Sequence, residues 1–451
     1  MGSEWRTVTL NEAGVTLIDC DHKTPKAVEN GKPYIGIPQL KNGRVILEGA
    51  RLISNEDFSH WRRKALPMPN DVILSRRCNP GETAYVPEGL NIALGQNLVL
   101  LRATNESVYP PFLRWLAQGP AWWVQVNNFI NVGAVFDSLK CADIPKFLIY
   151  LPPYQEQIKI SEILRSLDEK IQINESVNQT LEQMAQALFK GWFVDFEPVK
   201  AKIAVLEAGG SQEEATLAAM TAISGKDTDS LVLFERDHPE QYAELKATAE
   251  LFPSAMQESG LGEIPVGWEL GKLQDLLVLQ RGFDLPASAR TDGEYPLIAA
   301  SGPSGTHNKA MAKAPGVVTG RSGVLGKVFL VLEDYWPLNT TLWIKEFKRA
   351  TPCYAYELLS LLDLKAFNAG SAVPSLNRNH VHSLCYPLPP MNLVKAFESI
   401  ALLLHQRALN NTKKSQTLAT LRDTLLPKLL SGEITLPEAE AWAAQVDTQE
   451  A

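Results

Sequence analysis

Two arginines stand directly after predicted strands, where a side chain could bind nucleic acid. Arg76 follows the run 72–75, and Arg321 follows the run 316–320. A guanidinium on such a loop can form paired hydrogen bonds with guanine or hold a phosphate. A lone arginine is more often a surface charge. Because the two occupy corresponding places in a repeated pattern, binding and surface-charge interpretations are equally supported.

Amide side chains gather in two further corresponding places. The segment 125–131 reads QVNNFIN and precedes Gly133, and Asn368 precedes Gly370. Amides pair well with adenine, but asparagine is equally common in buried turns. The adjacent Trp122 and Trp123 are expected to be core residues.

Catalytic motifs are missing from the sequence. It has no phosphate-binding G-x-x-x-x-G-K-[ST] loop, no H-E-x-x-H metal pattern and no G-x-S-x-G nucleophile turn. An adenine methyltransferase needs Asn or Asp before Pro-Pro-Tyr/Phe, whereas residues 109–112 and 151–154 read YPPF and LPPY. We interpret both proline pairs as helix starts. The sequence therefore predicts neither a catalytic residue nor a metal site.

The chain contains a long internal repeat. Residues 133–139 (GAVFDSL) match residues 370–376 (GSAVPSL) at an offset of 237, and the same offset links the Leu-Pro-Pro triplets at 151–153 and 388–390. Earlier segments match at offsets of 263 and 245, which indicates that loop lengths differ there. The sequence predicts a duplicated unit in which a globular block is followed by a helix.

Both helices show a sustained apolar seam, which is typical of a coiled coil. The first seam runs through Ile160, Leu164, Leu167, Ile171, Asn174, Asn178, Leu181, Ala185, Leu188 and Trp192. The second runs through Phe397, Ala401, Leu404, Ala408, Asn411, Ser415, Leu418, Arg422, Leu425 and Leu429. Polar residues fall at the same steps of both seams and would fix the register of pairing. Two ordinary core helices are the weaker alternative.

The expected fold is α+β, with two mixed α/β blocks joined by two long antiparallel coiled-coil helices in a pseudo-twofold duplication. Expected strands include 34–39, 72–75, 97–101, 297–300, 316–319, 327–331 and 342–344. Short helices are expected at 111–117 and 354–362. The predicted divisions are 1–150 and 263–387 for the blocks, 151–196 and 388–434 for the spacer helices, 197–262 for a connector and 435–451 for a tail.

Charge is unevenly distributed over the 451 residues. The whole chain has a net charge of −8, and residues 195–262 alone carry 13 acidic and 5 basic side chains. The two blocks are thus near neutral, and a basic face on each is possible. We expect a partly helical surface connector here. The five cysteines are scattered, and no apolar run is long enough to span a membrane, so we expect a cytoplasmic protein.

Several motifs together resemble the specificity subunit of type I restriction-modification enzymes. They are LPPYQEQIKI at 151–160, QALFKGWFVDFEP at 186–198, GEIPVGW at 262–268 and LLPKLLSGEI at 425–434. The segment Asp21–Pro25 is similar to a family pattern that usually has glycine where Cys20 stands. The resemblance covers nearly the whole chain.

The resemblance implies a subunit that reads DNA without catalysing a reaction. Each block would be a target-recognition domain for one half of a bipartite asymmetric DNA sequence, and the coiled coil would set the spacing. The coils would also bind two methyltransferase subunits, and restriction/translocase subunits would complete the complex. S-adenosylmethionine, ATP and Mg would be bound by these partners. The alternatives are a self-sufficient adenine DNA methyltransferase and a coiled-coil scaffold that binds only protein.

Candidate DNA-binding residues come from the strand ends, polar turns and amide clusters of the two blocks. They are Lys23, Thr24, Gln39, Lys41, Ser75, Arg76, Arg77, Asn128, Asn131, Thr319, Arg321, Ser322, Ser371, Asn377 and Arg378.

Overall fold

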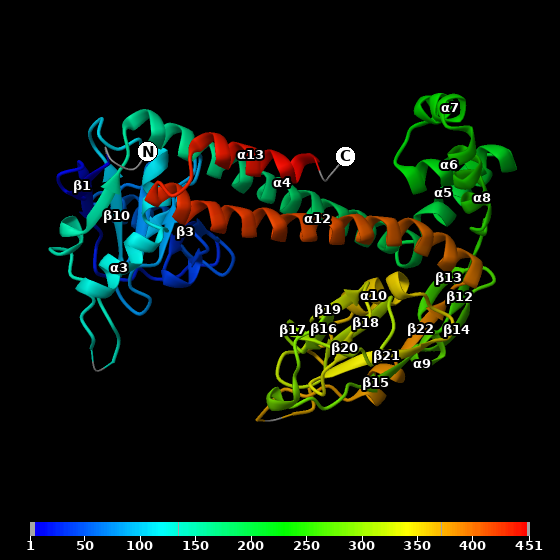
Figure 1. Cartoon of the computed structure of the whole chain (residues 1–451). Coiled ribbons are helices and arrows are strands. Elements are labelled where there is room, and N and C mark those ends of the chain that lie inside the picture. The colour runs from blue at the N-terminus through cyan, green and yellow to red at the C-terminus, as the bar shows by residue number, and fades with distance from the viewer. Residues whose placement is uncertain (1–4, 134, 371, 449–451) are drawn as a thin grey trace. The chain divides into compact units, whose positions relative to one another are not determined.

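The computed structural model describes residues 5–133, 135–370 and 372–448 (Figure 1). The chain forms two compact units. Unit 1 comprises residues 1–174 and 414–451, and unit 2 comprises residues 175–413. Each unit contains one β-rich lobe together with part of each of two long helices. No helix of the described residues is long and apolar enough to cross a membrane.

The N-lobe, residues 6–151, is built around a four-stranded antiparallel sheet of order β2-β10-β7-β8. A three-stranded sheet of order β6-β3-β9 and the pairs β1-β11 and β4-β5 complete it. Its strands are β1 (Arg6–Thr9), β2 (Val15–Asp19), β3 (Lys32–Ile35), β4 (Leu40–Lys41), β5 (Arg44–Val45), β6 (Arg51–Ile53), β7 (Val72–Ser75), β8 (Thr83–Tyr85), β9 (Ala93–Leu94), β10 (Leu98–Ala103) and β11 (Leu148–Leu151). Its α-helices are α1 (Asn55–Trp61), α2 (Leu113–Leu116) and α3 (Pro120–Phe129), with 3-10 turns at Ile37–Gln39, Pro110–Phe112 and Ile144–Lys146.

The C-lobe, residues 269–388, repeats this topology. Its main sheet has the order β15-β21-β18-β19, and its second sheet has the order β17-β16-β20. Strands β14 and β22 form a separate pair. The strands are β14 (Glu269–Lys272), β15 (Leu277–Arg281), β16 (Tyr295–Ala299), β17 (Gly302–His307), β18 (Gly316–Gly320), β19 (Val328–Val331), β20 (Trp336–Pro337), β21 (Thr341–Phe347) and β22 (Cys385–Leu388). The helices are α9 (Leu273–Leu276), α10 (Pro352–Leu361) and α11 (Arg378–His382), with a 3-10 turn at Ala287–Ala289. The predicted duplication is confirmed.

Central strands of each main sheet are buried on both faces, which explains why β7, β10 and β18 are largely apolar. In β7, Val72 and Leu74 belong to a core shared with the long helices, whereas Ile73 belongs to a second core under β9. In β18, Val317 belongs to the core shared with the long helices, and Val318 belongs to a separate core. One face of each sheet is therefore fixed to the helices.

The long helices have the expected extent. They are α4 (Tyr154–Phe193) and α12 (Met391–Ser431), with 40 and 41 residues. In unit 1, Leu164 and Leu167 of α4 share a core with Leu425 of α12. In unit 2, Trp192 of α4 contacts Phe397 of α12 at 6.1 Å between ring centroids.

Polar seam residues of the two helices bond to each other. Asn411 donates from Nδ2 to Oδ1 of Asn178 over 3.0 Å, and Asn178 donates from Nδ2 to Oγ1 of Thr412 over 3.0 Å. Within unit 2, α4 therefore meets the later part of α12 at Asn178 and its earlier part at Trp192. This direction of pairing is antiparallel.

Where the C-lobe packs on the helices, the buried positions differ from those of the predicted seam. Leu188 and Leu404 are only half-buried, while their neighbours Phe189 and His405 are buried. Phe189 contacts Tyr354 of α10 at 5.1 Å between ring centroids. A helix that packs against a lobe as well as another helix buries a wider face than a two-helix seam, and this accounts for the difference.

The connector is more helical than the expected partly helical surface segment. Four helices occupy most of it: α5 (Glu197–Glu207), α6 (Gln212–Ser224), α7 (Thr228–Asp237) and α8 (Pro239–Glu250). They enclose a small core of Ala219, Met220, Leu231 and Ala249. The pair β12 (Met256–Ser259) and β13 (Gly262–Pro265) follows, and α13 (Leu436–Thr448) follows α12.

Two local predictions in the N-lobe need correction. The strand expected at 34–39 ends at Ile35, because Pro38 lacks an N–H and Gln39 Oε1 accepts a hydrogen bond from the Gly36 N–H at 2.9 Å. Trp122 is buried as expected, but Trp123 is 42% exposed. Successive residues of a helix point in different directions, so α3 buries only the first of them.

Candidate nucleic-acid interface

The two candidate arginines occupy the same backbone environment in both lobes. The Arg76 N–H donates to the Asn97 carbonyl at 2.9 Å, and the Arg76 carbonyl accepts from the Leu139 N–H at 2.8 Å. The Arg321 N–H likewise donates to the Thr340 carbonyl at 2.8 Å, and its carbonyl accepts from the Leu376 N–H at 2.8 Å. We call residues 76–77 and 321–322 the arginine corners.

Side chains at the corners differ in exposure. The Arg76 side chain is 11% exposed and its Nη2 lies 4.0 Å from Asp19 Oδ1. Arg321 donates from Nε to the Asn339 carbonyl at 2.9 Å. Arg77 is exposed, and its guanidinium carbon lies 5.8 Å from the ring centroid of Phe136. Arg77 is thus the most accessible of these three arginines, which the sequence pattern alone did not distinguish.

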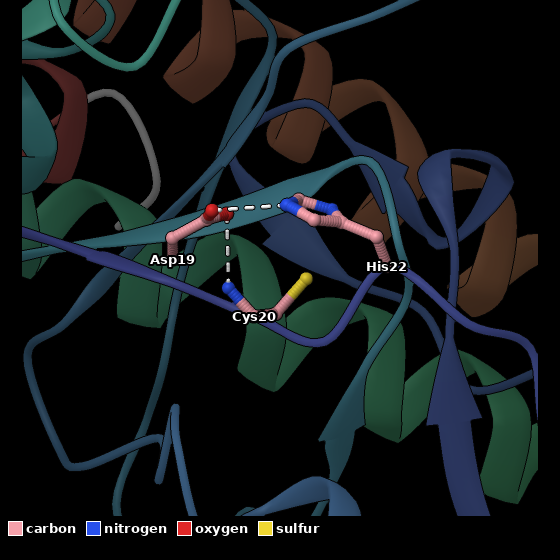
Figure 2. A group of neighbouring side chains, drawn as sticks. All are labelled: Asp19, Cys20 and His22. Atoms are coloured by element: carbon pink, nitrogen blue, oxygen red, sulfur yellow. Dashed lines mark hydrogen bonds and ion pairs between the residues drawn. The ribbon is translucent and has the colours of Figure 1, made fainter.

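A small polar cluster of Asp19, Cys20 and His22 lies at the end of β2 (Figure 2), next to the Arg76 guanidinium. His22 Nε2 lies 3.0 Å from Asp19 Oδ2, and the Cys20 thiol donates to the Gly95 carbonyl at 3.1 Å. Burial, reinforced by the Asp19 carboxylate, raises the pKa of the Cys20 thiol to about 11. The Cys20 thiol and the His22 ring are each already engaged by another group of the protein. We interpret the cluster as a support for Arg76.

Three candidate side chains are engaged inside the protein. The buried hydroxyl of Ser75 donates to the Arg77 carbonyl at 3.0 Å, and that of Thr319 donates to the Lys327 carbonyl at 2.8 Å. Gln39 is 8% exposed and holds the turn after β3. These contacts position the corners and the turn.

Thr24 and Gln39 line a hollow of about 610 Å³ in the N-lobe. Arg51, Gln96 and Asn97 also line it, and these three polar residues were absent from the candidates. Arg51 lies far in sequence from the neighbours Gln96 and Asn97, and only the fold brings it beside them, so no local pattern could identify the set. Asn97 links this hollow to the corner at Arg76.

Some other candidates form backbone contacts at the corners, and the rest of the described ones are exposed. In the N-lobe, Arg77 and Asn131 each form a β-bridge with Ser138, and in the C-lobe Ser322 forms one with Ser375. Asn131 is half-buried and its Nδ2 lies 3.4 Å from the Ser138 carbonyl. The exposed candidates are Lys23, Lys41 in β4, Asn128 in α3, Asn377 before α11 and Arg378 in α11. Asn377 directly follows Leu376, which donates to the Arg321 carbonyl. Ser371 lies outside the described residues.

Comparison with known proteins gives concordant matches. Residues 3–183 match the type I restriction modification DNA specificity domain. The chain is 29% identical over 380 residues to the HindI specificity subunit of Haemophilus influenzae, covering 76% of this chain and 78% of that protein. It is 23% identical over 444 residues to the MjaIX specificity subunit of Methanocaldococcus jannaschii, covering 90% and 87%.

The fold has a solved counterpart. The S subunit of a type I restriction-modification system from M. genitalium aligns with a TM-score of 0.51 at 15% identity, covering 94% of this chain and 96% of that one. Two β-rich lobes and two packed long helices, with matches over most of the length, define a DNA specificity subunit. The family model, both curated relatives and the solved structure all make the chain similar to the DNA specificity subunits of type I restriction-modification systems. Subunits of this family are non-catalytic, in agreement with the missing motifs.

Proposed function

We propose that each lobe reads one half of a bipartite asymmetric DNA target, and that α4 and α12 set the distance between the halves. The main support is the pair of arginine corners, in which one backbone hydrogen-bond pattern carries different side chains and surroundings. Two domains that recognise different DNA half-sites need a common backbone that presents different side chains. The DNA-contacting residues would come from the corners and the hollow beside β3.

The helices have a length suited to a spacer. At 1.5 Å per residue, 40 residues extend about 60 Å, and one turn of DNA is about 34–36 Å. The Asn178–Asn411 hydrogen bond favours one register of the pair. A fixed register would give a fixed gap between half-sites.

We further propose that the chemistry belongs to partner subunits. Two methyltransferase subunits, one for each repeat, would bind S-adenosylmethionine, and restriction/translocase subunits would use ATP and Mg. The absence of nucleotide-binding and methyltransferase motifs from the sequence supports this division. Since the substrate would be DNA, the complex is proposed to act in the cytoplasm.

A paired insertion tests the spacer. Seven residues added to α4 after Asn178 and seven added to α12 before Asn411 preserve the seam and lengthen both helices by about 10 Å, or ~3 base pairs. Methylome sequencing of cells that carry the variant and its partners should show both half-sites unchanged and a longer gap. An unchanged gap would refute the spacer role.

Substitution of Arg77 tests the corner. Arg77→Ala should weaken DNA binding by about 1–3 kcal/mol if the side chain contacts a base edge. The matched control is Arg165→Ala, which removes an exposed arginine of α4 that pairs with Glu169. Gel-shift titrations of the assembled complex should separate the two variants, and equal affinities would remove Arg77 from the interface.

A further inference from the structure

Each long helix carries one buried ionisable residue that faces its lobe. Asp168 of α4 and His405 of α12 are related by the repeat offset of 237. Their side chains are 2% and 8% exposed. The two residues are thus equivalent positions of the duplicated unit.

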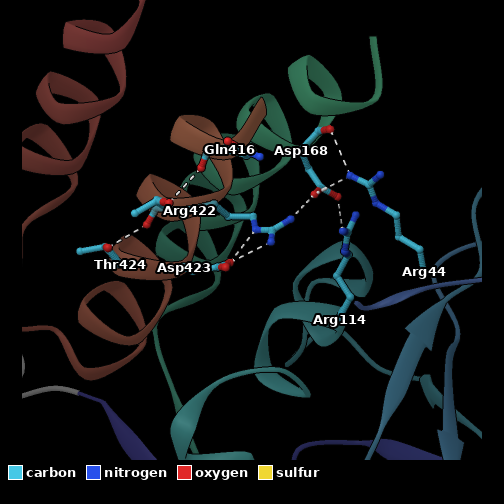
Figure 3. Close-up of polar contacts among 8 residues, drawn as sticks. Arg44, Arg114, Asp168, Gln416, Arg422, Asp423 and Thr424 are labelled. Atoms are coloured by element: carbon cyan, nitrogen blue, oxygen red, sulfur yellow. Dashed lines mark hydrogen bonds and ion pairs between the residues drawn. The ribbon is translucent and has the colours of Figure 1, made fainter. Parts of the chain in front are cut away.

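Asp168 holds the N-lobe in unit 1 through arginines (Figure 3). It accepts hydrogen bonds from Arg114 of α2, from Arg44 of β5 at 2.9 Å and from Arg422 of α12 at 2.7 Å. The Arg114 guanidinium also lies 3.7 Å from the Tyr85 ring centroid. The carboxylate of the helix therefore meets cations of the lobe.

His405 holds the C-lobe in unit 2 with the opposite arrangement. Its Nε2 lies 3.3 Å from Oε1 of Glu357 in α10, whose side chain is 4% exposed, although the two atoms do not have hydrogen-bond geometry. The Tyr356 ring contacts the imidazole at 5.3 Å between centroids. Here the long helix supplies an imidazole and the lobe supplies a carboxyl group.

The two lobe helices that make these contacts are equivalent. The segment containing α2 follows β10, and α10 follows β21, the same strand of the repeated sheet. In each unit a long helix also accepts a hydrogen bond from the backbone where the lobe segment begins. Gln157 of α4 accepts from the Tyr109 N–H at 2.8 Å, and Glu398 of α12 accepts from the Cys353 N–H at 2.9 Å.

A second pair of equivalent positions on the long helices also differs between the two repeats. Arg422, which joins Asp168, corresponds to Ala185 at the same offset of 237. Ala185 is fully buried in α4. The N-terminal docking position is therefore defined by Asp168 and Arg422, and the C-terminal docking position by His405 and Ala185.

We infer that the opposite polarity of these buried pairs determines which lobe docks at which position, so that the two lobes are not interchangeable. A C-lobe at the N-terminal docking position would bring Glu357 against Asp168. Two buried carboxylates repel, and a buried charge deprived of its partner is strongly destabilising. An N-lobe at the C-terminal docking position would bring Arg114 against His405. The helix has no carboxylate there to pair with the arginine.

Chimaeras of the full chain test this inference. In both, residues 269–388 replace residues 6–151, so that a C-lobe stands at each position. One keeps Asp168 and Arg422, and the other carries Asp168→His and Arg422→Ala. Hydrogen exchange of residues 154–174 should be roughly a hundredfold slower or more in the second chimaera. Equal exchange in the two folded chimaeras would overturn the inference.

A second pair of variants tests the same inference even if the chimaeras do not fold. His405→Asp and His405→Asn have nearly the same size in the otherwise native chain, but only aspartate places an acid opposite Glu357. Hydrogen exchange of α10 at pH 7 should be at least about tenfold faster in His405→Asp than in His405→Asn, because only the acid introduces like-charge repulsion. Adding Glu357→Gln to His405→Asp should remove most of this difference. Equal exchange in the two single variants would contradict the role of polarity.

Discussion

Replacement of Asp168 by asparagine should destabilise unit 1 by about 3–5 kcal/mol. The substitution keeps the size of the side chain but removes the charge that three arginines share. Arg114, Arg44 and Arg422 have side chains that are 10%, 18% and 17% exposed, so water compensates them poorly. The magnitude follows from the cost of breaking a buried ion pair.

The pH dependence gives an independent check. Burial alone would raise the pKa of Asp168, but the charges and hydrogen bonds of Arg114 and Arg44 outweigh it and hold the pKa below its usual value of 3.8. A lowered folded-state pKa stabilises the protein above the unfolded-state value, and this contribution is lost as the pH falls through the folded-state pKa. The difference between wild type and Asp168→Asn should stay constant above about pH 5 and shrink below pH 3.8.

Hydrogen exchange of residues 154–174 measures this stability locally. Glu169→Gln is the matched control, because the side chain of Glu169 is 57% exposed and pairs with Arg165 on the same helix. Such exposed pairs contribute at most about 1 kcal/mol. A loss below about 1 kcal/mol for Asp168→Asn, or a difference that does not shrink at all as the pH falls below 3.8, would refute the role given to the arginine cluster.

Two further predictions concern unit 2. Asn178→Leu alone leaves the half-buried amide of Asn411 without its acceptor and should cost about 0.5–1.5 kcal/mol, whereas adding Asn411→Leu should restore most of this loss. Denaturant titration of the single and double variants measures both changes. His382 accepts a hydrogen bond at Nε2 from the Leu279 N–H over 2.8 Å, and burial, helped by nearby cations, lowers the pKa of His382 from its usual 6.5. The contribution of His382 to C-lobe stability should therefore be complete above pH 6.5 and should be lost as the pH falls through the lowered pKa. This pH dependence should disappear in His382→Gln. If it persists in that variant, His382 is not its source.

The long helices and the duplication could be predicted from sequence because their signals are local or periodic. The range 154–193, free of proline and with an apolar residue every three or four positions, is one helix over its whole length. The repeated run before Leu139 and Leu376 led correctly to two lobes of one topology. In both cases the evidence lay in residues close together or at a constant offset.

The side-chain partners could not be predicted in this way. Asp168 and Arg422 are 254 residues apart, and no pattern in either segment indicates the other. Arg422 was placed on the seam, but its partner depends on how two helices and a lobe meet. Likewise, Arg76 and Arg77 are neighbours of the same type, and only the fold decides that Arg76 turns to Asp19 while Arg77 is exposed.

Different parts of the chain tolerate changes of length differently, and the corners show why. The chain from Arg76 to Leu139 is longer than the chain from Arg321 to Leu376, yet each pair forms the same hydrogen bond at 2.8 Å. Loops between strands can thus change length without moving the strand ends. A residue inserted in one long helix would shift the following side chains by about 1.5 Å and rotate them by about 100°, separating pairs such as Asn178 and Asn411. The constant offset through the helices, and the varying offsets before them, follow from this difference.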